Sequence, residues 1–211
     1  TQNQALAAIL FLYKGVLEIE LAWLDDVVRA NRPRRLPVVL TRDEVAGLLQ
    51  AMHGVNQLVA RLMYGSGMRL MEALRLRIQD IDFGYHQITV RAGRGNKDRT
   101  TLLPKSLETV MREQVEYAIR LHQGDLREGY GSVYLPYALG KKYPNADRET
   151  GWQYVFPSSK RSVDPLSGVT RRHHVYDKNL QRALKQATRK LDIHKRVSSH
   201  VLRHSFATHL L

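Results

Sequence analysis

The chain has 211 residues, of which 43% are hydrophobic, and it contains no cysteine. This length allows one domain with a substantial core and part of another, and the cysteine count excludes disulfides and thiolate metal sites. Lys and Arg total 33 against 20 Asp and Glu, a formal net charge of +13, which favours a polyanionic partner. A ribosomal or otherwise merely basic protein remains the alternative on charge alone.

The first residues carry an apolar pattern at helical spacing over 4–30, which predicts one or two helices. The longest apolar run, residues 5–13, is too short to span a bilayer and has no basic leader, so we expect a soluble, cytoplasmic protein without a membrane helix. Because the pattern starts without a helix cap, residues 1–30 are expected to be the C-terminal end of a larger N-terminal domain. Residues 31–40, with two prolines and three arginines, are expected to be an extended linker.

A second domain is predicted to begin at Thr41. Thr41 and Glu44 have the spacing of a capping box ahead of a helix. Two more helical patterns cover residues 57–64 and 68–76, separated by a glycine-containing turn at 65–67.

Three short alternating runs follow, and they predict a small antiparallel sheet: residues 78–83, 87–92 and 100–103. Pro104 ends the last of them, and an amphipathic helix is predicted over 107–121. The expected fold class is therefore mainly α with a three-stranded antiparallel sheet (α+β).

Residues 124–169 hold six Gly, four Pro, five Tyr and one Trp, with one short helical pattern at 135–141. A structureless loop of this length is unusual in a compact domain, so we expect a specialised insertion with its own packing. Residues 176–191 are predicted to be helical. Ser198 or Ser199 is expected to cap a last helix that still continues at residue 211, which suggests that the domain over 41–211 lacks its C-terminal part.

Three groups of residues could carry chemistry, and the first is the pair Arg69 and Glu72, at the start of a helix that follows a glycine turn. A guanidinium there can hold a phosphate with two parallel hydrogen bonds, and Glu72 can hold the guanidinium. A surface ion pair is an equally good interpretation of this pair alone.

The second group is the hairpin over 93–99, whose Lys97 can reach a phosphodiester and donate a proton to a departing oxygen. Basic hairpin tips are common, and a solvated turn is the alternative. The third group is His200 and Arg203, which lie three residues apart and so share one face of the last helix. His200 and His204 also have the spacing of a zinc-binding helix, but Val201 stands where such a helix carries its glutamate base.

Taken in order, the motifs over 67–72, 93–99 and 200–211 resemble those of the tyrosine recombinase family. The resemblance implies the catalytic-domain fold of that family. It also implies that Arg69 and Arg203 clamp the scissile phosphate with support from Glu72, that Lys97 is the general acid to the 5′ oxygen, and that His200 handles the proton at the attacking oxygen. Two fixed guanidinium groups stabilise a phosphodiester under attack without a metal, so no cofactor or metal is expected.

The insertion resembles the element that distinguishes integron integrases, which integrate and excise gene cassettes of mobile elements at folded single-stranded sites. In that family it engages bases flipped out of the stem, a task that suits aromatic side chains among cations. The expected DNA contacts are Trp152 first, then Tyr154 and His174, and the cations Lys141, Lys142, Arg94, Arg171 and Arg172. The alternative is that these aromatic side chains form a small core of the insertion itself.

The nucleophilic tyrosine of the family lies beyond the His-x-x-Arg helix, whereas all ten tyrosines of this chain precede His200. We therefore expect this chain to bind DNA without cleaving it. The resemblance also implies that the full-length parent acts as a tetramer on DNA. Two alternatives stay open: a non-catalytic DNA-binding module, and a chromosomal or phage recombinase that acts on duplex DNA.

Overall fold

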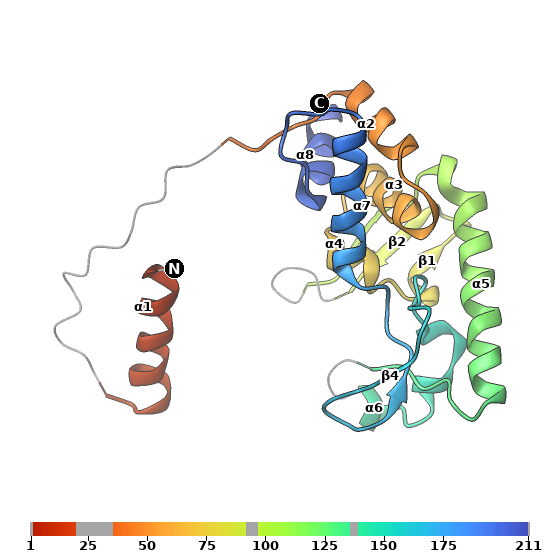
Figure 1. The fold of residues 1–211 in the computed structure, drawn as a ribbon. Coiled ribbons are helices and arrows are strands. Elements are labelled where there is room, and N and C mark those ends of the chain that lie inside the picture. Colours follow the sequence, from red (N-terminus) through yellow and green to blue (C-terminus); the bar gives the residue numbers. More distant parts are fainter. Residues whose placement is uncertain (1, 20–35, 92–96, 136–138, 211) are drawn as a thin grey trace. The chain divides into compact units, whose positions relative to one another are not determined.

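The computed structural model describes residues 2–19, 36–91, 97–135 and 139–210 (Figure 1). It divides into two compact units, Thr1–Leu36 and Pro37–Leu211. In the first unit, helix α1 spans Gln2–Leu10 and continues as a π-helical segment, Phe11–Val16, and neither contains a buried residue. The assignment of residues 1–30 to a larger N-terminal domain stays a prediction.

The second unit is mainly helical. Thr41 and Glu44 form the predicted capping box, because the Thr41 hydroxyl accepts from the Glu44 N–H and the Glu44 carboxylate accepts from the Thr41 N–H. Among the described residues, no helix is both long and apolar enough to cross a bilayer. The main helices are α2 (Arg42–Gln50), α3 (Gly54–Ser66), α4 (Leu70–Leu74), α5 (Glu108–Arg127), α7 (Asp177–Lys190) and α8 (Ser199–His209).

A three-stranded antiparallel sheet packs among these helices, in the order β1 (Ile81–Asp82), β2 (Gln87–Val90) and β3 (Arg99–Leu102). The expected α+β fold class is confirmed. The first strand is shorter than predicted, because residues 78–80 form a 3-10 turn in which the Asp80 carboxylate accepts from the Arg77 N–H.

One large hydrophobic core joins the helices to the sheet. Buried side chains from α2, α3, α4, α5, α7 and α8 meet the inner face of β2, and α7 and α8 lie beside α3 (Figure 1). The largest fully buried side chains include Leu48, Leu62, Met63, Leu74, Ile88, Met111 and Phe156.

The insertion has a second, smaller core, which consists of Val133, Leu135, Ala146 and Tyr154 with Leu139 and Trp152 packed at its margin. Its other elements are α6 (Leu139–Lys142), 3-10 turns at Ala146–Arg148 and Thr150–Trp152, and a two-stranded sheet of β4 (Ser162–Val163) and β5 (Thr170–Arg171) that the sequence did not predict. Helix α5 extends to Arg127, so the irregular segment begins later than residue 124.

Hydrogen bonds between extended segments fasten the insertion to the main core. The Val155 N–H donates to the Leu76 carbonyl at 2.9 Å, and the Val175 N–H donates to the Phe156 carbonyl at 2.8 Å. The end of α4, the middle of the insertion and the approach to α7 therefore run side by side.

Candidate functional site

The site is built around the glycine turn that ends α3. Gly67 has a left-handed backbone (φ +63°), and a Cβ at this position would lie 2.5 Å from the Phe206 ring of α8. Only glycine combines that backbone with such a close approach. The helix continues through Gly65 and Ser66, which the sequence placed in the turn.

Two neighbouring carbonyls of this turn bind elements that are distant in sequence. The Ser66 carbonyl accepts from the Thr101 hydroxyl of β3 at 2.7 Å, and the Gly67 carbonyl accepts from the Arg203 guanidinium of α8. The turn therefore brings β3 and α8 to the residues that precede α4.

Arg69 occupies the N-cap position of α4, directly before its first turn. The Glu72 carboxylate accepts from the Arg69 N–H at 2.8 Å and from the Arg69 guanidinium at 2.9 Å. The carboxylate is only 9% exposed, whereas the guanidinium side chain is 38% exposed. Glu72 thus holds the backbone N–H and one guanidinium nitrogen of Arg69, and the rest of the guanidinium can donate hydrogen bonds to a ligand.

Arg99 is a further cation of this cluster, and the sequence interpretation did not single it out. Its guanidinium donates to the second oxygen of Glu72 at 2.6 Å, with its side chain 35% exposed. The signal that could have found it is the alternation of β3, since Arg99 and Thr101 are both half-buried while Thr100 and Leu102 are exposed.

The charges of the cluster influence one another. Burial opposes ionisation of Glu72, but hydrogen bonds from Arg69 and the charges of Arg99 and Arg69 outweigh it, so the pKa of Glu72 lies below its ordinary value. Burial also lowers the pKa of Arg203, the charges of Arg69 and Arg99 lower it further, and Glu72 opposes them. Three guanidinium groups around one carboxylate leave an excess of positive charge that an anion can neutralise.

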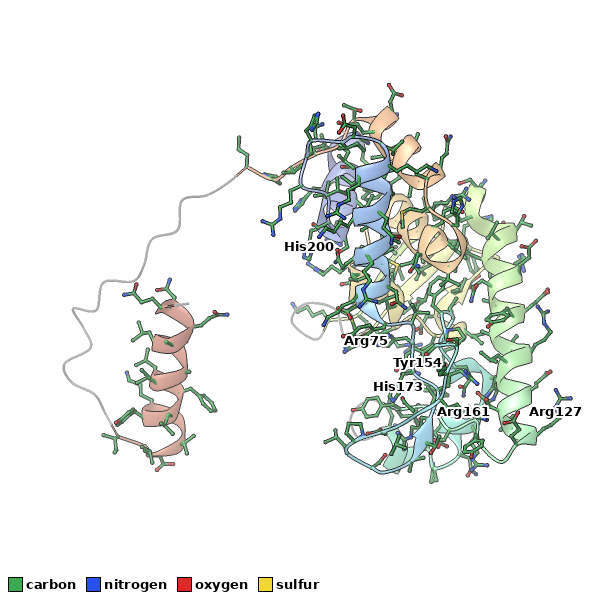
Figure 2. The ribbon with its side chains drawn as sticks, viewed as in Figure 1. Arg75, Arg127, Tyr154, Arg161, His173 and His200 are labelled. Atoms are coloured by element: carbon green, nitrogen blue, oxygen red, sulfur yellow. The ribbon has the colours of Figure 1, made fainter. Side chains whose placement is uncertain are left out.

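The remaining two predicted catalytic residues, His200 and Lys97, are both exposed. His200 is exposed in the first turn of α8 (Figure 2), three residues before the partly buried Arg203. Lys97 is exposed two residues before Arg99. In the described part of the chain, neither makes a hydrogen bond or ion pair with the three arginines. Ser198 is the N-cap of α8 without a side-chain cap, and the Ser199 hydroxyl accepts from Gln181.

The aromatic side chains expected to contact DNA differ in their burial. Tyr154 (Figure 2) is 6% exposed. Its hydroxyl accepts from the buried Arg77, and the Arg77 guanidinium covers its ring at 3.7 Å. The His174 ring packs edge-on against Tyr154, with 5.3 Å between centroids, and burial lowers the pKa of His174. Tyr154 is therefore a core residue of the insertion. His174 and Trp152 are both only partly buried.

The cations named for the insertion also divide into two groups. Arg172 makes a two-pronged ion pair with Asp125 of α5, and Arg171 pairs with Asp164, and both arginine side chains are less than a fifth exposed. These two arginines hold the insertion together. Lys142 is exposed beside the Tyr143 ring. The Lys141 side chain and Arg94 lie outside what the structure describes.

No group of three His, Asp or Glu side chains that could hold a metal ion occurs in the described ranges. The second histidine of the zinc-type spacing, His204, is exposed on α8.

The sequence matches known proteins over nearly its whole length. Residues 38–211 match the model of the phage integrase family. An integrase/recombinase of Escherichia coli is 49% identical over all of this chain, which covers 63% of that protein, and one of Pseudomonas aeruginosa matches to the same extent. The tyrosine recombinase XerD of Mycobacterium tuberculosis is 32% identical over 99% of the chain and 60% of its own length. The chain thus spans less than two thirds of these relatives.

Solved structures share the fold. XerA recombinase superimposes with a TM-score of 0.54 at 24% identity, over 99% of this chain and 61% of its own. The XerH site-specific recombinase bound to palindromic difH substrate, a post-cleavage complex, superimposes with a TM-score of 0.57 at 20% identity, over 97% of this chain and 52% of its own. With its arginines gathered at one turn and its sequence matched from residue 38 to its last residue, the chain belongs to the phage integrase family of tyrosine recombinases.

Proposed function

We propose that this chain is the phosphate-binding part of a site-specific DNA recombinase that joins strands through a 3′-phosphotyrosine intermediate. The observation that carries the proposal is the turn at Gly67, which brings Arg203 of α8 to the residues before Arg69. The net charge of +13 supports a nucleic-acid partner. A DNA substrate also agrees with the cytoplasmic location expected from the sequence.

In this mechanism a tyrosine oxygen attacks the phosphorus while the bond to the 5′ oxygen breaks. Negative charge grows on the two non-bridging oxygens, and the guanidinium groups of Arg69 and Arg203 stabilise it with charge-assisted hydrogen bonds. Lys97 donates the proton that the departing 5′ oxygen needs, and His200 takes the proton of the attacking hydroxyl. Glu72 keeps Arg69 in place.

The clamp is tested by the salt dependence of DNA binding. Each lost phosphate contact should lower the slope of log affinity against log salt by about 0.9. We expect this loss in Arg69→Ala and in Arg203→Ala, together with binding at least about tenfold weaker, or 1.4 kcal/mol. The control is Arg120→Ala, an exposed arginine of α5 that is paired with Glu116. Equal slopes for all four proteins would refute the clamp.

The 211-residue chain itself should bind DNA and form no covalent adduct. The Tyr64 ring packs edge-on against the His209 ring of α8. The Tyr64 hydroxyl is hydrogen-bonded to His209 at 2.8 Å, so this tyrosine oxygen already has a partner. A chain extended to the length of the relatives should form an adduct with a nicked substrate, and Arg203→Ala should abolish it. If the extended chain forms no adduct, the non-catalytic DNA-binding module is the better interpretation. If it does, cross-linking on DNA tests the proposed tetramer.

We further propose the integron type of substrate, a folded single strand with extrahelical bases. The support is the insertion, whose separate core holds Trp152 at its margin with the Arg91 guanidinium 6.0 Å from the ring. A bulged hairpin should bind more tightly than its perfect duplex, and Trp152→Ala should remove the difference, since stacking is worth roughly 1–3 kcal/mol per base. Tyr154→Phe, a change in the interior, should keep it. Equal binding of both DNAs by the unaltered chain would favour a duplex-specific recombinase.

A further inference from the structure

Arg99 occupies a position that links two parts of the proposed site. It is the first residue of β3, paired across the sheet with Val90, and it stands two residues after Lys97. Its guanidinium donates to Oε2 of Glu72, the same oxygen that accepts the Arg69 N–H, while Oε1 accepts the Arg69 guanidinium. One buried carboxylate thus joins the start of β3 to the arginine that would hold the phosphate.

Both oxygens of the Glu72 carboxylate accept hydrogen bonds, and these bonds together hold the carboxylate in one orientation. Glu72 projects from a helix of five residues, too short to fix the side chain by itself. Without Arg99, Oε2 of Glu72 would accept a hydrogen bond from the Arg69 N–H only. The carboxylate could then rotate and release the Arg69 guanidinium. The Thr101 hydroxyl, on the same face of β3, binds the Ser66 carbonyl and holds the strand against α3 independently of Arg99.

We propose that Arg99 is a positioning residue, which acts through Glu72 to aim the Arg69 guanidinium. This inference rests on the proposed phosphate clamp. It assigns to Arg99 no contact with DNA, so the loss of Arg99 and the loss of Arg69 should remove the same phosphate contact.

The test compares Arg69→Ala, Arg99→Ala and the double variant in the 211-residue chain, by fluorescence anisotropy with a labelled duplex at several salt concentrations. Arg99→Ala should weaken binding by about tenfold and lower the salt slope by about 0.9. The double variant should bind no more weakly than Arg69→Ala. Arg99→Lys, which can keep the ion pair with Oε2, should restore most of the affinity.

Arg161→Ala is the matched control. The Arg161 guanidinium pairs with the buried carboxylate of Asp125 and with Glu128, so it is a second arginine bound to a buried acid. Its removal should lower the thermal midpoint and leave affinity and salt slope unchanged.

Two results would overturn the inference. If the losses in the double variant add, to a slope change of about 1.8, Arg99 binds a phosphate itself. If Arg99→Ala lowers only the thermal midpoint, it is merely structural. Failure of the clamp is recognised separately, because then neither Arg69→Ala nor Arg203→Ala changes the slope.

Discussion

Gly67 joins α3 to the residues before α4 and is in direct contact with α8. In Gly67→Ala, the left-handed backbone costs roughly 1–2 kcal/mol, and the new Cβ meets the Phe206 ring. We expect lower stability in urea denaturation, and weaker DNA binding because Arg203 loses its anchor on the Gly67 carbonyl.

The matched control is Gly124→Ala in α5. Nothing lies within 4 Å of the position where its Cβ would be, so alanine should stabilise the helix by about 0.5–1 kcal/mol. A Gly67→Ala chain as stable as the unaltered protein would contradict the close packing of α8 on the turn.

Glu72 predicts a pH dependence of stability. Its folded-state pKa lies below the ordinary value of 4.5, so its contribution is complete above that value and is lost as the pH falls through the folded-state pKa. The stability difference between the unaltered chain and Glu72→Gln should therefore be constant from pH 7 to about 5 and shrink below it. Burial raises the pKa of Asp80, so its contribution to stability changes with pH in the opposite sense. Asp80 is present in both proteins, so this contribution cancels in the difference between them. A difference that grows on acidification would exclude this role for Glu72.

At the scale of elements, the end of α5 and the insertion are joined through Asp125. This carboxylate is 5% exposed and accepts from Arg172 at 2.6 and 2.7 Å, and from Arg161 at 3.2 Å. Asp125→Ala would leave the Arg172 guanidinium buried without its partner, which costs about 3–5 kcal/mol. Urea denaturation should show this loss.

Glu116→Ala on the same helix is the comparison. Glu116 and Arg120 are both about two-thirds exposed and lie 3.8 Å apart, an arrangement that contributes little to stability. Its denaturation midpoint should remain that of the unaltered chain. Equal effects of the two substitutions would mean that Asp125 does not hold the insertion.

At the scale of the whole molecule, stability should reside in the unit Pro37–Leu211. Every buried hydrophobic side chain of the described residues lies at or beyond Leu40, and α1 has none. A chain that starts at Pro37 should unfold at the same urea midpoint with nearly the same m-value, since m follows the surface exposed on unfolding. A clear fall in the midpoint would show that the first unit stabilises the second.

The sequence by itself determined the order of the elements and much of the candidate site. The capping box at Thr41, the alternation in residues 87–90 and the helical spacing before Arg203 depend on neighbours within a few residues, and such local effects can be seen in one chain. The ends of two helices differ from the predicted ones, since α3 runs through Gly65 and α5 runs to Arg127. Tertiary packing stabilises both helices beyond glycines that only weakly disfavour a helix.

Only the tertiary structure decided which polar groups meet. Arg99 binds a carboxylate 27 residues away, and Arg203 binds a carbonyl 136 residues away. It also decided that Tyr154 is buried beneath the Arg77 guanidinium, while His174 and Trp152 stay partly exposed. The partner of an arginine or the free face of a ring depends on the register between distant segments, and the types of the residues alone do not specify that register.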